Sequence, residues 1–309
     1  MTDLQIRRIP FEFDDSVPFQ WNTANPDFGL MANAIGVLAV AFEKYIVAVT
    51  RQVIPLLKDP AVAEEAEAFL RQEAQHARSH RLHITALIER HPGLRETLDE
   101  AIASYDRLRE QKPLEYHVAY IAALEATFTP LFKMMLDNRA SLFTPGDDRV
   151  SSLFEWHFVE EVEHRSSALV IYHDLVKNPW YRTRIASNAF SHAVSVYKGI
   201  MEGFERHVPL KDRLVTARRM MPKSIWLREV GVRLPVVGRR IAADRYPTAF
   251  QDVPMKQLAV TFVRLLLSQA PHHRPSEEPL PDLADVWFAA YDRGEDMTRF
   301  SGSPLGASS

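Results

Sequence analysis

Residues 69–81 read FLRQEAQHARSHR and residues 154–168 read FEWHFVEEVEHRSSA, and these two stretches decide the fold. Each contains a glutamate followed three positions later by a histidine, Glu73 with His76 and Glu161 with His164. Side chains three residues apart share one face of an α-helix. If both stretches are helical, the two pairs can therefore point four polar side chains at one level of a helical core.

Two further apolar stretches each carry a glutamate near their middle. Glu43 and Glu125 are flanked mainly by apolar residues at three and four positions on either side. Burying a lone carboxylate costs several kcal/mol unless it is paired, protonated or bound to metal. These two residues are therefore candidates for a functional role.

One inward glutamate from each of two helices, with Glu-x-x-His from each of two others, is the di-metal carboxylate pattern of ferritin-like bundles. The candidate catalytic and metal-binding residues, in chain order, are Glu43, Glu73, His76, Glu125, Glu161 and His164. Their four carboxylates would neutralise two divalent cations. The alternative is a set of buried Glu–His ion pairs that stabilise the fold without metal.

Proline, glycine and capping residues divide the chain into helices and breaks. Only 11 of 309 residues are glycine, which argues against a sheet-rich fold with many tight turns. We expect an all-α protein with long helices over about 27–57, 60–90, 114–139 and 147–177, and a short charged helix over 94–110. Pro130 should kink the third long helix.

This is the plan of a ferritin-like four-helix bundle with one long crossover. The expected organisation is an N-terminal arm (1–27), the bundle with its di-metal site (28–179), a helical C-terminal extension packed on the bundle (180–300) and a disordered tail (301–309).

Other side chains lie in register with the two pairs. His157 precedes Glu161 by four residues, and we predict it as a seventh metal ligand, although a place outside the ligand set is open. His80 follows His76 by four residues and is a candidate for the pocket wall or for a contact that supports a ligand, with a role as a further metal ligand also open. Glu160 competes with Glu161, but only Glu161 is three residues from His164. Residues expected to hydrogen-bond the ligands are Arg165 and Asp174.

The composition narrows the function classes. Cysteine is absent, which excludes disulfides, thiolate metal sites and a cysteine nucleophile. The formal net charge of -3 gives no indication of nucleic-acid binding. The N-terminal sequence MTDLQIRRIPFEFDDS has no apolar core of a signal peptide, and the apolar stretch 30–42 is too short to span a bilayer. We therefore expect a cytoplasmic protein.

Residues 211–245 contain ten Lys or Arg and three acidic residues. Such a stretch is usually a solvated or packing surface. The alternative is weak contact with an anionic membrane surface or with an acidic partner, with Trp226 and Leu234 as apolar anchors. A homodimer is also open.

The chain resembles the bacterial "predicted metal-dependent hydrolase" family of the ferritin-like superfamily. The resemblance covers roughly residues 4–180 and rests on IRRIPFEF, FQW, Phe42-Glu43 and the two stretches quoted first. The family's Q-E-x-x-H-x-x-x-H and W-H-x-x-E-E-x-E-H blocks are both present. At the first ligand the family usually has a Pro-x-Gly-Glu-like segment; residues 40–43 here read VAFE, which keeps only the carboxylate. The spacing of His157, Glu161 and His164 also resembles p-aminobenzoate N-oxygenase-type di-iron enzymes, where an extra histidine ligates one metal.

The expected cofactor is two divalent metal ions, iron first, with manganese and zinc as alternatives. From the ligand chemistry we expect an O2-activating oxidase or oxygenase acting on a small apolar organic substrate. The alternative is a metal-dependent hydrolase that activates water, as the family description implies. A metal store is the third hypothesis.

Overall fold

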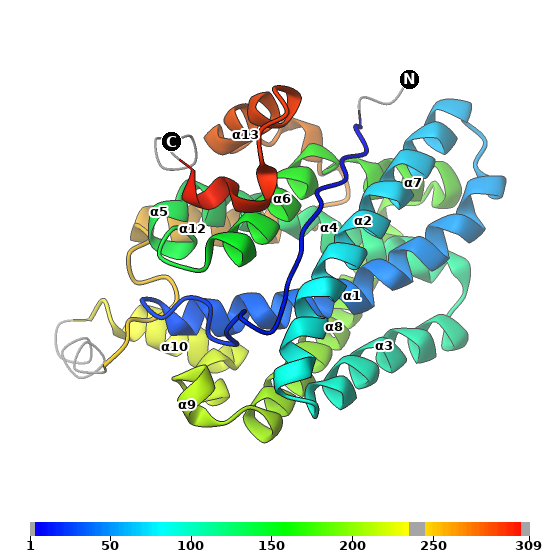
Figure 1. Ribbon diagram of the computed structural model, residues 1–309. Coiled ribbons are helices and arrows are strands. Elements are labelled where there is room, and N and C mark those ends of the chain that lie inside the picture. Colours follow the sequence, from blue (N-terminus) through cyan, green and yellow to red (C-terminus); the bar gives the residue numbers. More distant parts are fainter. Residues whose placement is uncertain (1–3, 235–244, 304–309) are drawn as a thin grey trace.

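A computed structural model describes residues 4–234 and 245–303 (Figure 1), and these residues form helices and loops with no strand. The prediction of an all-α protein is confirmed. Four helices carry the predicted site: α1 (Pro26–Val53), α2 (Pro60–Arg90), α4 (Leu114–Asp137) and α6 (Asp148–Glu163). α1 packs along α2, α4 packs against α6, and the two pairs contact each other.

Local sequence signals set where these helices begin. The Asn25 side chain accepts a hydrogen bond from Phe28 N, and Pro26 occupies the first helical position. Asp59 caps α2 in the same way, ahead of another proline. At α6 the Asp147 carboxylate accepts from two backbone N–H groups. Each cap satisfies amide groups that the first turn leaves unpaired.

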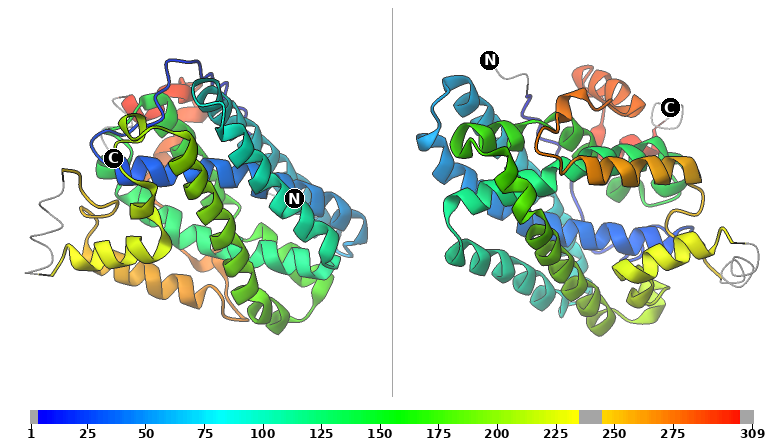
Figure 2. Two further views of the ribbon diagram at one scale, coloured as in Figure 1. Left: turned by 90° about the horizontal axis from the view of Figure 1, so that it is seen from below. Right: turned by 180° about the vertical axis from the view of Figure 1, so that it is seen from behind.

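The remaining helices cover this core. α3 (Leu94–Gln111) and α8 (Pro179–His207) pack against each other and against α1. α8 also contacts α4, as does α12 (Met255–Leu267), which lies on the far side of the molecule from α2 (Figure 2). The other helices are η1 (Ile54–Leu56), α5 (Arg139–Leu142), α7 (Ser167–Val176), α9 (Leu210–Arg213), η2 (Ala217–Met220), α10 (Pro222–Gly231), η3 (Pro275–Glu277), α13 (Asp282–Asp292) and η4 (Met297–Gly302).

α1 is long and strongly apolar. Together with η1 it is, among the described residues, the one helix long and apolar enough to cross a membrane by length and composition, yet 72% of its apolar window is buried inside the protein. Such burial is typical of a core helix.

The prediction of one continuous helix over 147–177 was wrong. α6 ends at Glu163, His164 caps it, and α7 begins at Ser167. In an unbroken helix the Val162 carbonyl would accept from the amide of residue 166. Here the Arg165 guanidinium donates to that carbonyl over 2.7 Å, so the break leaves the carbonyl satisfied. By contrast, α4 runs through Pro130 as a single helix.

The N-terminal arm is part of the core. Its trace passes between α2 and α6 in Figure 1. Phe11 packs on Trp156 with ring centroids 5.5 Å apart, and Trp21 stacks on Phe154. The irregular segment therefore covers the helices that carry the Glu-x-x-His pairs.

The C-terminal end also packs on α6. η4 contacts α6, where the buried Ser301 donates its amide to Ser152 Oγ over 2.9 Å. The disordered tail predicted for 301–309 therefore does not begin at residue 301. Residues 304–309 lie outside the described residues.

One buried ion pair, between α5 and α6, allows the packing around α6 to be tested. Arg139 Nε lies 2.9 Å from Glu155 Oε1, and both side chains are buried. Removing one partner of a buried pair typically costs about 3–5 kcal/mol, whereas replacing both by apolar residues is often neutral. We expect Arg139→Met to lower the free energy of unfolding by that amount and Arg139→Met/Glu155→Met to recover most of it, measured by urea denaturation. A loss under 1 kcal/mol in the single variant would contradict this.

Candidate metal centre

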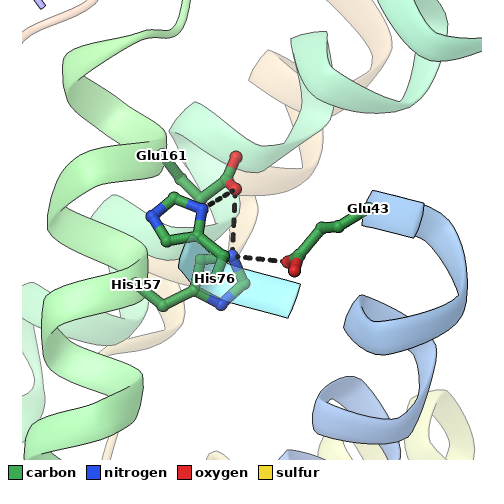
Figure 3. Close-up of side chains that lie close together, drawn as sticks. All are labelled: Glu43, His76, His157 and Glu161. Atoms are coloured by element: carbon green, nitrogen blue, oxygen red, sulfur yellow. Dashed lines mark hydrogen bonds and ion pairs between the residues drawn. The ribbon is translucent and has the colours of Figure 1, made fainter. Parts of the chain in front are cut away.

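Four side chains from three helices converge on one point in the core (Figure 3). They are Glu43 of α1, His76 of α2, and His157 and Glu161 of α6, and one ligand atom of each lies within 4.8 Å of those of the others. His157 Nε2 is 3.1 Å from Glu43 Oε1 and 2.9 Å from Glu161 Oε1. His76 Nδ1 is 3.6 Å from the same Glu161 oxygen. All four side chains are buried. We call this group cluster 1.

A second group shares one of these residues. Cluster 2 consists of Glu73 of α2, Glu125 of α4, Glu161 and His164, again with ligand atoms within 4.8 Å of one another. His164 Nε2 lies 3.3 Å from Glu73 Oε1, 3.6 Å from Glu125 Oε2 and 3.1 Å from Glu161 Oε2. Glu161 thus turns one oxygen to each cluster. A carboxylate placed in this way can bridge two cations.

The structure brings together all seven residues singled out from the sequence. It divides them differently from the motif, because Glu73 and His76 contribute to different clusters. His157 belongs to cluster 1, and Glu161 rather than Glu160 occupies the shared position. Their role as metal ligands stays a prediction, which the polar atoms at the site support.

Several buried polar atoms at the site lack a hydrogen-bond partner within the described structure: Glu43 Oε2, both oxygens of Glu73, Glu125 Oε1 and His76 Nδ1. Each buried unsatisfied group costs about 1–3 kcal/mol, and more when it is charged. Oxygen and imidazole nitrogen donors are suitable ligands for divalent first-row metals. The donor set therefore fits two divalent cations.

The second ring nitrogen of each cluster histidine also has a partner, which supports a metal-binding role. His76 Nε2 donates to Glu160 Oε2 over 2.9 Å, and His164 Nδ1 donates to Gln72 Oε1 over 3.0 Å. His157 Nδ1 pairs with His80 Nε2 at 2.8 Å. Each imidazole thus directs one nitrogen at the carboxylates of its cluster, and its other nitrogen is held by a residue outside the two clusters. This arrangement is typical of metal-ligating histidines.

Crowding of the carboxylates shifts their pKa values in the absence of metal. Burial, with the neighbouring charge of Glu161, raises the pKa of Glu125 to about 7 and that of Glu73 well above its ordinary value. Burial alone would raise the pKa of Glu161 as well, but His164 and His157 hold it well below its usual range. The metal-free site therefore keeps protons where cations would bind.

The pKa values of His157 and His164 are also raised, which favours their protonated form. Burial opposes protonation of His157, but the charge of Glu43 and the hydrogen bond to Glu161 raise its pKa to about 9. The pKa of His164 is raised well above 6.5 for the same kind of reason. His80 differs, because burial and the charge of His157 lower its pKa well below 6.5.

Two expected ligand partners lie elsewhere. Arg165 donates to the carbonyls of Val162 and Pro275, and the Asp174 carboxylate accepts from the Lys58 amide. Neither contacts the clusters in the described structure, so this prediction was wrong: the helix break turns α7 away from the direction that a continuous helix would give.

Sequence reasoning missed three outer residues. Gln72 precedes His76 by four positions, so helical periodicity does indicate it. Glu163 lies inside the second Glu-x-x-His motif, but it is two positions after Glu161 and therefore on another face of the helix. Arg7 lies in an irregular segment, so residue spacing carries no signal for it.

The fold and site define an all-α protein whose core holds two adjoining carboxylate–histidine clusters suited to divalent cations. A family model described as "Predicted metal-dependent hydrolase" matches residues 5–237, about three quarters of the chain, and the protein therefore belongs to that family. The matched segment contains all seven cluster residues. Comparisons with curated proteins and with solved structures gave no match.

The raised pKa values predict how pH affects the metal-free protein. Glu125 binds a proton up to about pH 7 when folded, against an ordinary pKa of 4.5, and His157 up to about pH 9 against 6.5. The folded state then holds more protons than the unfolded state, so stability falls as pH rises. Buried histidines with a lowered pKa, such as His80 and His83, oppose this trend below pH 6.5 but are neutral in both states above about pH 7. With a chelator present, we therefore expect the melting temperature to drop by about 5 °C between pH 7 and 9.

Added Mn²⁺ or Zn²⁺ replaces these protons and should abolish most of that drop, as measured by differential scanning fluorimetry. Equal melting curves with metal and with chelator at pH 8.5 would contradict the prediction. The lowered pKa of Glu161 acts only in more acidic solution, where its protonation removes stability.

Proposed function

We propose that the protein is a metal-dependent hydrolase whose centre consists of two divalent cations held by clusters 1 and 2. The observation that carries this proposal is the shared Glu161, which faces both clusters with separate oxygens. Membership of the family described as metal-dependent hydrolases supports it. Two bound cations lower the pKa of water and polarise a carbonyl or phosphoryl oxygen.

The chain supplies proton acceptors at the same place. Neither oxygen of Glu73 has a hydrogen-bond partner, and Glu125 Oε1 also lacks one. Whichever of these oxygens were left uncoordinated once the cations are bound would be the one to take a proton from water, as a general base does. Gln72 and Glu160 fix the histidine rings while this occurs.

The arrangement of the helices supports a more specific proposal for the fold. α1, α2, α4 and α6 each contribute a glutamate, in the order expected of a ferritin-like bundle. We propose such a bundle with a fourth helix divided into α6 and α7, and α8–α13 as an extension packed on it.

A second candidate is an O2-activating oxidase or oxygenase of small apolar organic molecules. The observation that favours it is the place of His157 in cluster 1. Four carboxylates and three imidazoles suit iron or manganese better than zinc. The proposal of two bound cations is common to both candidates, which differ in the reaction.

Metal removal tests the first candidate. The protein loaded with Mn²⁺, Zn²⁺ or anaerobic Fe²⁺ is screened with ester, amide and phosphoester substrates, and metal content is measured by mass spectrometry. We expect two cations per chain and hydrolysis that a chelator abolishes. Glu161→Gln should lose more than half of the metal and at least 100-fold in kcat/KM, while Glu89→Gln, on the exposed side of α2, keeps both. Hydrolysis that survives chelation would refute the proposal.

Oxygen distinguishes the two candidates. The Fe²⁺-loaded protein is mixed with air-saturated or nitrogen-flushed buffer and small organic compounds. The hydrolase proposal expects equal turnover with and without O2. Oxygen uptake coupled to oxidation of the organic compound, without hydrolysis, would replace it with the second candidate.

We also propose weak contact with an anionic membrane surface. Trp226 and Leu227 of α10 are more than 60% exposed, one turn beyond the exposed Lys223. α12 lies on the same side of the molecule as α10 (Figure 2), and its exposed apolar side chains include Phe262 and Leu266. Apolar side chains beside lysines are typical of surfaces that dock on anionic lipids.

Vesicle flotation tests this contact. We expect binding to vesicles containing phosphatidylserine at low salt and little binding to phosphatidylcholine alone. Trp226→Ser/Leu227→Ser should reduce binding at least fivefold, whereas the control Leu56→Ser, exposed at the end of η1, should not. Binding independent of salt and of lipid charge would count against the electrostatic part.

A further inference from the structure

Arg7 of the N-terminal arm is buried against α6. Its Nη1 donates to Glu160 Oε1 over 3.1 Å and to Glu163 Oε2 over 2.8 Å, and its Nη2 donates to Glu163 Oε1 over 2.9 Å. Only 4% of its side chain is exposed. One guanidinium thus binds one glutamate in a two-point contact and a second glutamate beside it.

From Arg7 one chain of hydrogen bonds reaches cluster 1. The other oxygen of Glu160, Oε2, accepts from His76 Nε2 over 2.9 Å. This leaves His76 Nδ1 directed at Glu161. Arg7 is therefore separated from a cluster residue by a single carboxylate.

A second chain reaches cluster 2. Glu163 Oε2 accepts from Gln72 Nε2 over 2.8 Å. Gln72 Oε1 in turn accepts from His164 Nδ1 over 3.0 Å, which leaves His164 Nε2 directed at Glu73, Glu125 and Glu161. Because the Gln72 amide nitrogen is engaged by Glu163, its oxygen is the atom that faces His164.

The other side of Arg7 is covered by aromatic rings of α13. Its Cζ lies 4.4 Å from the ring centroid of Phe288, 5.7 Å from Tyr291 and 5.9 Å from Trp287. Aromatic faces attract a guanidinium, and they also exclude water from its contacts. The hydrogen bonds of Arg7 are thereby strengthened.

We propose that Arg7 is a positioning residue for both proposed metal sites. It neutralises Glu160 and Glu163 and orients them, so that His76 and His164 each present a fixed ring nitrogen to their cluster. The inference rests on the proposed binding of two cations but not on the reaction that they serve. Loss of such an outer partner typically lowers metal affinity 10- to 100-fold.

Metal binding in the absence of any substrate tests the proposal. Metal-free protein is titrated with Co²⁺ under nitrogen, and the affinity and the visible ligand-field absorption are recorded for each site. We expect Arg7→Gln to weaken both sites at least tenfold and to shift their absorption. Arg7→Lys should rescue only in part, because a lysine cannot reproduce the two-point contact. Arg8→Gln, at the exposed neighbouring position, is the matched control and should match the unmodified protein.

Substitutions in the two chains separate the sites. Glu160→Gln should weaken the site that contains His76, and Glu163→Gln the site that contains His164, each leaving the other within about threefold. These variants also carry the test if Arg7→Gln does not fold. The melting temperature of each metal-free variant identifies a purely structural role.

Unchanged Co²⁺ affinity and absorption in a folded Arg7→Gln protein, with only a lower melting temperature, would overturn the role of Arg7. Equal weakening of both sites by Glu160→Gln and Glu163→Gln would overturn the separate chains. Absence of Co²⁺ binding by the unmodified protein would instead overturn the proposed metal centre itself.

Discussion

The constraint on which the structure depends is the mutual repulsion of four glutamates enclosed in a helical core. Glu43, Glu73, Glu125 and Glu161 are all buried, and several of their oxygens lack a hydrogen-bond partner. Such an arrangement costs free energy unless positive charge is supplied. Protons can supply it in part, as the raised pKa values of Glu73 and Glu125 indicate. Two divalent cations would supply it in full, and the histidines then remain neutral.

Much of the candidate site could be predicted because the spacing of residues along a helix determines the direction in which their side chains point. Asp59 and Asp147 indicated the starts of α2 and α6, whereas the cap of α1, Asn25, was not recognised in the sequence. The apolar surroundings of Glu43 and Glu125 indicated that both point inward. The partition of the ligands was beyond prediction, because side chains three residues apart on α2 diverge enough to join different clusters. At the break after α6 the Arg165 side chain folds back onto the Val162 carbonyl, a contact that periodicity does not encode.

The residues around the clusters show the limit of motif reasoning more clearly. Glu160 and Glu161 are neighbours of one type, yet one faces both clusters and the other supports His76 from outside. Helical geometry makes adjacent side chains diverge by about 100°. Arg7 lies in a segment without regular structure, and its contacts bridge more than 150 positions along the chain. Only tertiary structure brings it to the site.

The aromatic cover over Arg7 has a consequence for how such a centre can vary. The family match ends at residue 237, whereas Phe288, Trp287 and Tyr291 belong to α13, beyond that limit. The cluster residues therefore lie within the matched segment, whereas the aromatic rings that cover Arg7 come from a separate part of the chain. Substitutions in α13 can tune the dielectric environment of the centre, and with it the ligand strength of two histidines, without altering any ligand.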